Sequence, residues 1–391
     1  MNELKKKKLS RPSIFIHCNY VYGIGHFVRM AELSRGLCKH FEIYLLTGGE
    51  PVPNYNISSE INYIQMPAIY SVEKQQKLLP VDKNLTLEQC LSMRSAIIEE
   101  LVCKIKPDIL ITEHFPFGPL FENEAISLIA QVKKNNPQNK IISSVRDVIL
   151  TGEGSTRDSH ACSLINKWYD LILVHGDSSI VPFESSFPMV EKIKIPLCHT
   201  GYIVQSIRQR RSPSNRPILV VSVGGGRMGG ELLDAVLKVH KRIARQWQHQ
   251  LVLFVGAFQK DTQKLHEYVT QNNLHNVKIF QFDKEDYHQI LAEASAVICM
   301  GGYNSLLEAV SIRKPVLIYN RLFHGNNQEQ NLRMVRFQKA GLVRIINSDE
   351  LDREKLADLI IRAITRFRGS RFKIKIDGVH ETLKILKNFF Q

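Results

Sequence analysis

The chain alternates between short β-rich runs and helix-length segments, and it goes through this alternation twice. Strands that alternate with helices form parallel sheets with helices on their faces. We therefore predict an α/β fold of two Rossmann-like, doubly wound parallel-sheet domains that face a cleft. The strand candidates of the two halves are residues 14–18, 41–46, 108–112, 140–145 and 171–174, then 218–223, 251–255, 277–280, 296–300 and 315–319.

A polar stretch between the two halves suggests the domain boundary. Residues 208–216 combine four arginines with a proline, which is typical of an exposed linker. The length of 391 residues fits two domains of roughly 100 to 200 residues each. We predict a first domain over residues 1–206, a linker over 207–216, a second domain over 217–370, and a C-terminal helix within 371–391 that packs back on the first domain.

The charge of the chain is strongly positive, since 52 lysines and arginines face 38 aspartates and glutamates. The four lysines at 5–8 and the basic residues between 362 and 375 suit an anionic membrane, although a solvated basic surface without a partner explains them equally well. No recognition helix, zinc finger or aromatic-interleaved basic motif is present, so we do not expect nucleic acid as a partner. Neither a secretory signal nor an apolar run of about 20 residues occurs. We expect a cytoplasmic protein, free or associated with the inner face of the membrane.

Three glycine turns follow strands and precede helices, at residues 23–25, 224–230 and 301–302. Ligands of open parallel sheets bind at the carboxyl ends of the strands, where such turns expose backbone N–H groups and a helix N-terminus to an anion. Glycine also occurs there merely because a turn needs a positive φ. The G-x-G-x-x-G spacing of dinucleotide sites and the G-K-[ST] ending of P-loops are missing, which argues against NAD binding and ATP hydrolysis.

Two residues beside these turns are candidates for chemistry. His26 closes the first turn at the start of a helix, where the positive helix end disfavours a protonated imidazole and so suits a general base. Glu308 lies where a carboxylate could reach the hydroxyls of a sugar, but Ser305 to Glu308 also reads S-x-x-E, a helix capping box. The spacing leaves both interpretations open. Further candidates by position alone are the polar residues that end first-half strands: Glu113, His114, Arg146, Asp147, His175 and Asp177.

The order of several motifs resembles a known family. Residues 299–308, CMGGYNSLLE, are followed by RKPVLI at 313–318 and by Glu329-Gln330-Asn331. This series is similar to the nucleotide-sugar half of GT-B glycosyltransferases of family 28, the group that includes the peptidoglycan N-acetylglucosaminyltransferase. Residues 22–29, YGIGHFVR, are similar to the first glycine loop of the same superfamily.

The resemblance implies roles for individual residues. Glu308 would bind the ribose hydroxyls of UDP, Gly301 and Gly302 would face the pyrophosphate, Gln330 would contact the donor sugar, and Phe282 would lie near the base. The other residues placed at the nucleotide-sugar site are Gly25, Gly225, Gly226, Asn304 and Ser305. Residues 224–226 read Gly-Gly-Gly where the peptidoglycan enzyme has Gly-Gly-Ser, and the first loop lacks that enzyme's Gly-Gly-Thr-Gly-Gly-His pattern. These departures put a lipid acceptor like that enzyme's in doubt.

The first loop also resembles a hydrolase. The segment from Gly23 to Arg29 is similar to the G-x-G-H-x-x-R loop of the nucleotide-sugar hydrolase of pseudaminic acid synthesis, in which the histidine assists attack by water. The two resemblances share a fold and a leaving group but differ in the nucleophile.

We predict a glycosyltransferase that moves a sugar, with an N-acetylhexosamine as one candidate, from a UDP-sugar to a hydroxyl of a sugar, a lipid-linked or a small-molecule acceptor. The reaction would be a direct displacement with His26 as base. No Asp-x-Asp sequence and no C-x-x-C pair occurs, so we expect neither a metal site nor a cofactor besides the UDP-sugar co-substrate. The alternatives are the hydrolase, an epimerase acting on the same donor, and a non-catalytic nucleotide-sugar-binding protein.

Overall fold

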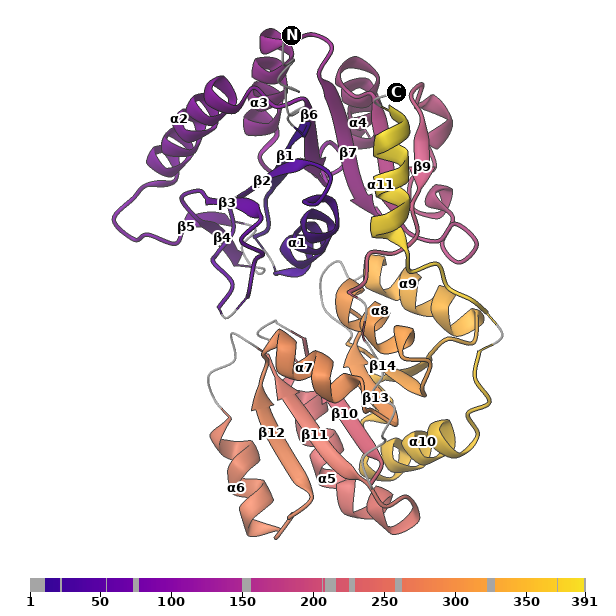
Figure 1. Ribbon diagram of the computed structural model, residues 1–391. Helices are drawn as coiled ribbons and strands as arrows, with labels where there is room; N and C mark the ends of the chain where they lie inside the picture. The colour runs from indigo at the N-terminus through magenta and orange to yellow at the C-terminus, as the bar shows by residue number, and fades with distance from the viewer. Residues whose placement is uncertain are drawn as a thin grey trace, which may run out of the picture.

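The computed structural model contains two parallel sheets, one in each half of the chain (Figure 1). It describes residues 11–21, 23–53, 55–72, 77–149, 156–205, 207, 216–224, 229–256, 262–321, 328–370 and 372–389. Within these residues every neighbouring pair of strands in both large sheets is parallel. The predicted fold class is therefore confirmed.

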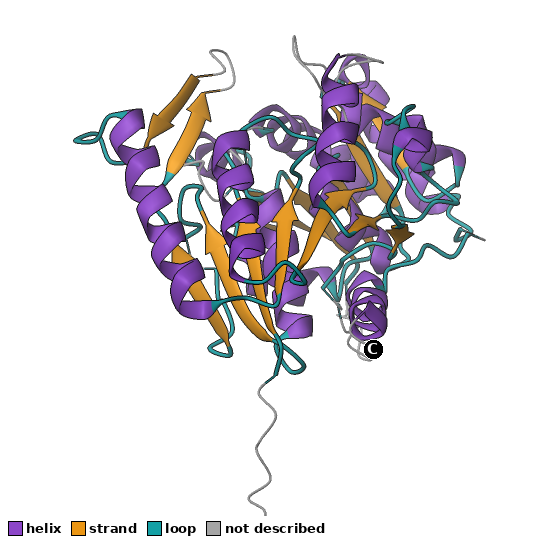
Figure 2. Cartoon of the chain, turned by 90° about the horizontal axis from the view of Figure 1, so that it is seen from above, coloured by secondary structure: helices purple, strands orange, loops and turns teal. Residues whose placement is uncertain are grey.

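The first sheet has seven strands in the order β3-β2-β1-β6-β7-β8-β9. Figure 2 shows helices on both of its faces. The central strands β1, β6 and β8 are buried along their whole length, which explains why they read as unbroken apolar runs. The strands are β1 Ser13–Cys18, β2 Glu42–Thr47, β3 Ile61–Gln65, β6 Ile109–Glu113, β7 Lys140–Arg146, β8 Leu171–His175 and β9 Leu197–His199. The helices are α1 Gly25–Leu37, α2 Leu87–Ile105, α3 Glu122–Asn135 and α4 Thr156–Trp168, with 3₁₀ turns at Phe183–Ser185 and Val190–Lys192.

The second sheet has six strands in the order β12-β11-β10-β13-β14-β15. Two apolar clusters cover its faces. Helix α5 packs against α10 and β11, and its buried side between Leu232 and Ile243 is apolar except for His240. The strands are β10 Ile218–Ser222, β11 Gln250–Val255, β12 Val277–Gln281, β13 Ala296–Met300, β14 Val316–Asn320 and β15 Arg344–Asn347. The helices are α5 Gly230–Gln246, α6 Gln263–Gln271, α7 Lys284–Leu291, α8 Tyr303–Ser311, α9 Gln328–Lys339 and α10 Arg353–Thr365, with a 3₁₀ turn at Ser348–Glu350.

All ten strand candidates form strands, with ends that differ by one residue or so. The sequence did not predict four segments, which are short or lie at an edge: β3, β9, β15 and the small antiparallel hairpin of β4 Ile69–Val72 with β5 Lys77–Pro80. Strand β3 shows why, since its sequence INYIQ places polar residues between apolar ones and one of its five residues is buried. Edge strands bury less surface and so carry a weaker apolar pattern.

The end of the chain returns to the first domain as α11, Gly378–Phe389, which packs against α1 (Figure 1). The two helices approach so closely that a Cβ on Gly36 would lie 2.0 Å from Val379 Cγ1. Leu383 and Phe389 pack against the apolar cluster of the first domain. Of the predicted linker at 207–216, only residues 207 and 216 belong to the described part of the chain.

The two domains share an apolar contact beside the cleft. Tyr202 of the first half lies with its ring centroid 5.7 Å from that of Phe337 and 5.9 Å from that of Tyr303 in the second half. Val148 and Ile180 join the same buried cluster. This contact holds the carboxyl ends of the two sheets opposite one another.

Candidate functional site

Two helices begin next to one another where the domains meet, one from each domain. Asn304, in the first turn of α8, donates from Nδ2 to the carbonyl oxygen of Gly25, the first residue of α1, at 3.1 Å. A Cβ on Gly25 would lie 2.8 Å from Arg146 Nη2, so only glycine fits here without a shift of that guanidinium. Helix N-termini carry unpaired N–H groups and partial positive charge. The cleft therefore brings two such helix ends together.

His26 and Glu113 form a hydrogen-bonded pair beside these helix ends. His26 Nδ1 lies 2.6 Å from Oε1 of Glu113, the last residue of β6. Burial alone would raise the pKa of Glu113, but His26 and Arg29 outweigh it and lower that pKa to about 2. An ionised carboxylate can only accept a hydrogen bond, so Nδ1 carries the imidazole proton and Nε2 keeps its lone pair. Burial and then Arg146 lower the pKa of His26 despite Glu113. His26 is thus neutral at pH 7, as a general base must be.

Arg29 and His114 complete the surroundings of this pair. Arg29, three residues after His26, donates from Nη2 to the same Glu113 oxygen and is 1% exposed. The His114 ring centroid lies 5.4 Å from that of His26, and burial followed by the proximity of His26 lowers the pKa of His114 to about 4. Both histidines therefore stay uncharged near neutral pH, and Arg29 supplies the positive charge that keeps Glu113 ionised.

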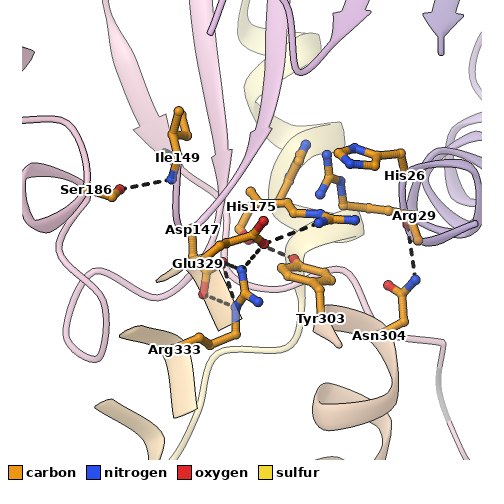
Figure 3. A network of polar contacts seen from close by, with 12 residues as sticks. His26, Arg29, Asp147, Ile149, His175, Ser186, Tyr303, Asn304, Glu329 and Arg333 are labelled. Atoms are coloured by element: carbon orange, nitrogen blue, oxygen red, sulfur yellow. Dashed lines mark hydrogen bonds and ion pairs between the residues drawn. The ribbon is translucent and has the colours of Figure 1, made fainter. Parts of the chain in front are cut away.

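Tyr303, the first residue of α8, lies among three arginines. Its ring centroid is 5.5 Å from Cζ of Arg29, 5.6 Å from Cζ of Arg146 and 5.2 Å from Cζ of Arg333. Its hydroxyl donates to the carbonyl oxygen of His175, the last residue of β8, at 2.8 Å. Figure 3 shows the ring between Arg333 and Glu329 on one side and Arg29 and His26 on the other. Tyr303 thus fastens the start of α8 to the first domain.

An ion chain made of Arg146, Glu329, Arg333 and Asp147 crosses between the domains. Figure 3 labels Glu329, Arg333 and Asp147 of this chain. Arg333 Nη2 donates to Asp147 Oδ1 at 2.7 Å, and its Nε lies 3.0 Å from both oxygens of that carboxylate. Arg333 Nη2 also donates to Glu329 Oε1 at 2.7 Å, and Arg146 Nη1 donates to the same oxygen at 3.2 Å. Glu329 therefore bridges an arginine of each domain.

Glu308 lies in the second domain and pairs with a histidine. It is 7% exposed, and its Oε1 lies 3.0 Å from Nε2 of His288 in α7. The N-cap of α8 is Gly302, so Ser305 lies inside the helix and the capping-box interpretation is wrong. In the same part of the second domain, the ring centroid of Phe282 lies 5.4 Å from that of Tyr287, the residue before His288. The carboxylate is thus not engaged as a helix cap.

A further polar contact joins the domains at Lys284, the first residue of α7. Lys284 Nζ lies 2.6 Å from Glu32 Oε1 in α1 and 5.0 Å from the ring centroid of Tyr55. The Tyr55 hydroxyl donates to the same Glu32 oxygen at 3.1 Å. The cleft is therefore bridged at α7 as well as at α9.

The other predicted site residues occupy varied positions. Gly301 lies against Met334, since a Cβ would be 2.6 Å from Met334 Sδ, whereas Gly302 has open space at its Cβ position. Gln330 is partly buried in the first turn of α9, directly after Glu329. Gly225 and Gly226 lie outside the described residues, although the preceding Gly224, with φ of 73°, places its Cβ position 3.1 Å from Ser305 Oγ. The ligand contacts assigned to all of these residues stay predictions.

The strand-end residues are mostly at the site, and some important residues were not foreseen. Glu113, His114, Arg146, Asp147 and His175 gather around the cleft floor, as the contacts above describe. Asp177 instead accepts from the backbone N–H of Lys375 at 3.1 Å and so holds the returning chain. Sequence reasoning missed Arg333, His288 and Lys284. Only Arg333 could have been expected from the sequence, because it follows Glu329 by four residues on one helix and so can pair with it.

The second half of the chain matches a family model. Residues 219–366 match the glycosyltransferase family 28 C-terminal domain. The UDP-N-acetylglucosamine–N-acetylmuramyl-(pentapeptide) pyrophosphoryl-undecaprenol N-acetylglucosamine transferase of Staphylococcus aureus is 23% identical over 185 residues, which is 47% of this chain and 46% of that enzyme. The chain thus matches about half the length of such curated relatives.

Solved structures resemble the whole chain. MurG of Acinetobacter baumannii aligns with a TM-score of 0.54 at 12% identity, covering 96% of this chain and all of that one. A protein of Listeria monocytogenes identified as a UDP-N-acetylglucosamine 2-epimerase aligns with a TM-score of 0.61 at 13% identity, covering 97% of each chain. These likenesses show the GT-B fold, and with the family match they support the predicted family 28 glycosyltransferase.

Two kinds of feature are absent from the described residues. No group of three His, Cys, Asp or Glu side chains could hold a metal ion there. No helix in the described ranges has the length and apolar character needed to cross a bilayer.

Proposed function

We propose that this chain, whose residues 219–366 belong to glycosyltransferase family 28, transfers a sugar from a UDP-sugar to a hydroxyl acceptor. The observation that carries the proposal is the His26–Glu113 pair, 2.6 Å apart, beside the N-termini of α1 and α8. A neutral imidazole with an oriented tautomer is equipped to take a proton, and two helix ends can stabilise a departing diphosphate. The sugar would be an N-acetylhexosamine or a related hexose, and the acceptor a sugar, a lipid-linked sugar or a small molecule.

The proposed reaction is a direct displacement. The acceptor oxygen bonds to the anomeric carbon while its proton passes to Nε2 of His26, and the bond from that carbon to the diphosphate oxygen breaks with its electron pair. Glu113 stabilises the imidazolium that forms, because its charge is held at the Nδ1 side by Arg29. The negative charge that develops on the diphosphate meets the helix ends and so needs no metal ion in this scheme.

The proposed donor site lies in the second domain. Glu308 would accept hydrogen bonds from the ribose hydroxyls, Phe282 would pack on the base, and Gln330 would contact the sugar. The remaining proposed contacts to the diphosphate and ribose are those of Gly25, Gly225, Gly226, Gly301, Gly302, Asn304 and Ser305. Support comes from Glu308, whose side chain is nearly buried and, among the described residues, has one side-chain partner, His288, which a ligand could replace.

Calorimetric titration of UDP tests the donor site. Charge-assisted hydrogen bonds are worth about 1.5–3 kcal/mol, so Glu308→Ala should weaken UDP binding by roughly 10- to 150-fold. Glu285→Ala, which removes an exposed carboxylate from α7, is the matched control and should leave binding unchanged. Equal UDP affinity of the wild type and Glu308→Ala, or no binding at all, would refute this assignment.

A nucleotide-sugar hydrolase is the second candidate, and Arg29 is the observation that favours it. Arg29, the last residue of the G-x-G-H-x-x-R loop, donates a hydrogen bond to Glu113, which is also bonded to His26. The histidine and the arginine of the motif therefore share one carboxylate. The same base could activate water. Incubating UDP-sugars without an acceptor and following free sugar by NMR separates the two, because a transferase would release little sugar until an acceptor is added.

We also propose that the enzyme works at the cytoplasmic face of an anionic membrane. The returning segment before α11 exposes several cations: Arg362, Arg366, Arg368, Lys373 and Lys375. Each cation near an anionic surface contributes about 1 kcal/mol. Co-sedimentation with vesicles containing phosphatidylserine should succeed at low salt and fail at high salt, and absence from the vesicles at low salt would end this idea.

A further inference from the structure

Arg146 stands at the point where the two domains and the two helix ends meet. It is the last residue of β7, and its guanidinium lies against Gly25 at the start of α1. The same guanidinium lies 5.6 Å from the ring centroid of Tyr303 at the start of α8. Arg146 is therefore a cation of the first domain that contacts the first residue of each of these two helices.

Arg146 is poorly bonded compared with Arg333. Among the described residues, its one hydrogen bond is the 3.2 Å contact from Nη1 to Glu329, and its buried Nε has no partner. Arg333 is bonded to both oxygens of Asp147 at 2.7 to 3.0 Å and to Glu329 at 2.7 Å. Its buried Nη1 also has no partner among the described residues, as is true of Nε and Nη1 of Arg29, so Arg146 differs from Arg333 in having a single, longer hydrogen bond. A buried guanidinium N–H without a partner costs free energy, which a further acceptor would recover. Arg146 thus has unused donors.

Glu329 occupies the position of an anion between these arginines. Its carboxylate is 29% exposed, so a ligand in the cleft can reach it. Burial would raise the pKa of Glu329, but Arg146 and Arg333 outweigh burial and lower it strongly. Glu329 is therefore ionised at neutral pH. Because Arg333 already holds the shared oxygen at the shorter distance, Glu329 would keep a strong partner if it lost Arg146.

We propose that Arg146 binds a phosphate of the donor's diphosphate. Without donor, Glu329 is the anion paired with Arg146; when the donor binds, its phosphate replaces Glu329 there, and Glu329 remains paired with Arg333. The proposal rests on the UDP-sugar function proposed above and adds a diphosphate ligand from the opposite domain. A guanidinium matches the geometry of a phosphate with two parallel hydrogen bonds, and here it faces a ligand that two helix ends also attract. Donor binding would thereby draw on both domains.

The charges around Arg146 determine what a phosphate would have to displace there. The surrounding guanidiniums of Arg29, Arg146 and Arg333 are balanced by the carboxylates of Glu113, Asp147 and Glu329. A diphosphate must therefore compete with Glu329 rather than fill a vacant positive site. Removing the charge of Glu329 should therefore strengthen diphosphate binding, whereas most mutations inside a binding site weaken it.

Calorimetry with three probes tests the proposal: UDP, uridine and inorganic pyrophosphate. Arg146→Gln should weaken UDP and pyrophosphate binding by roughly 10- to 150-fold, the worth of a charge-assisted hydrogen bond, and leave uridine unchanged. Glu329→Gln should tighten UDP and pyrophosphate severalfold and again leave uridine unchanged. Arg336→Gln on α9 and Glu285→Gln on α7 are the charge-matched controls, since Arg336 is bonded to Ser185 and Glu285 is exposed.

The outcomes separate this proposal from the proposed function. If UDP binds to the wild type but Arg146→Gln weakens uridine as much as UDP, or Glu329→Gln fails to tighten UDP, the Arg146 assignment is wrong and the donor site stands. If pyrophosphate binds through Arg146 while UDP does not compete with it, the anion site stands and belongs to a phosphate of another substrate. If neither probe binds the wild type, both proposals fall. Thermal melting checks the fold of each variant, and Glu329→Gln alone decides the case if Arg146→Gln does not fold.

Discussion

The first and third glycine turns occupy the same place in two similar sheets, yet the structure holds their polar residues in different ways. His26, after the first turn, is bonded to a carboxylate 87 residues away that a buried arginine also fixes. Glu308, after the third turn, is bonded to one histidine 20 residues away. The first arrangement places two partners on one carboxylate and sets a tautomer, whereas in the second the described residues give Glu308 one side-chain partner, which a ligand could replace. We infer that the first turn serves chemistry and the third serves binding.

The largest expected effect comes from breaking the first arrangement. Glu113→Gln keeps the shape of the side chain but replaces the acceptor of the His26 Nδ1 proton with a neutral amide. Turnover should fall by roughly 100- to 1,000-fold, the range expected for disturbing a positioned base. UDP affinity by calorimetry should stay within twofold of the wild type. A loss of UDP binding equal to the loss of turnover would show that the two turns do not divide chemistry and binding.

Folding must be checked in the same variant, because Arg29 would lose its charged partner. Uncompensated buried charges can cost about 3–5 kcal/mol. Arg29→Gln combined with Glu113→Gln removes both charges and should recover stability in urea unfolding but not turnover.

The sequence was sufficient for the architecture but only partly for the site. Apolar strands and intervening helices determine a parallel sheet, so both sheets were predicted. The partner of His26 was not, because it depends on β6 being the neighbour of β1, as the pairing of Ile16 with Ile111 shows. Strand order is fixed by packing over the whole domain rather than by local spacing. The capping-box alternative for Glu308 failed for a local reason, since α8 begins at Tyr303, two residues before Ser305.

The pH dependence of folding stability at the first site should show an effect of intermediate size. The pKa of His114 is about 4 in the folded protein and near 6.5 when exposed, so the unfolded chain binds more protons between these values. Stability should therefore fall as the pH drops below about 6.5, by on the order of 1–3 kcal/mol at pH 4. The loss of the Glu113 contribution comes later, below about pH 4.5, because its pKa is about 2.

Urea unfolding at a series of pH values measures this slope. His114→Asn suits the test, since His114 has a φ of 64° and asparagine tolerates this left-handed backbone. The variant should show a shallower fall between pH 6.5 and 4.5 than the wild type, and His40→Asn at an exposed position should not. Identical slopes for all three proteins would mean that His114 is not held neutral by its surroundings.

The smallest expected effect comes from the third turn. His288→Gln removes the imidazole that lies 3.0 Å from Glu308 Oε1 but leaves a side chain that can still donate to it. A hydrogen bond of this kind contributes about 0.5–1.5 kcal/mol, so UDP affinity should change by roughly two- to tenfold, with no change in turnover at saturating donor. His275→Gln, at an exposed position in the same domain, is the control. If His288→Gln lowered saturated turnover as strongly as Glu113→Gln, the second domain would take part in the chemical step, and the contrast between an exchangeable binding turn and a fixed catalytic turn would fail.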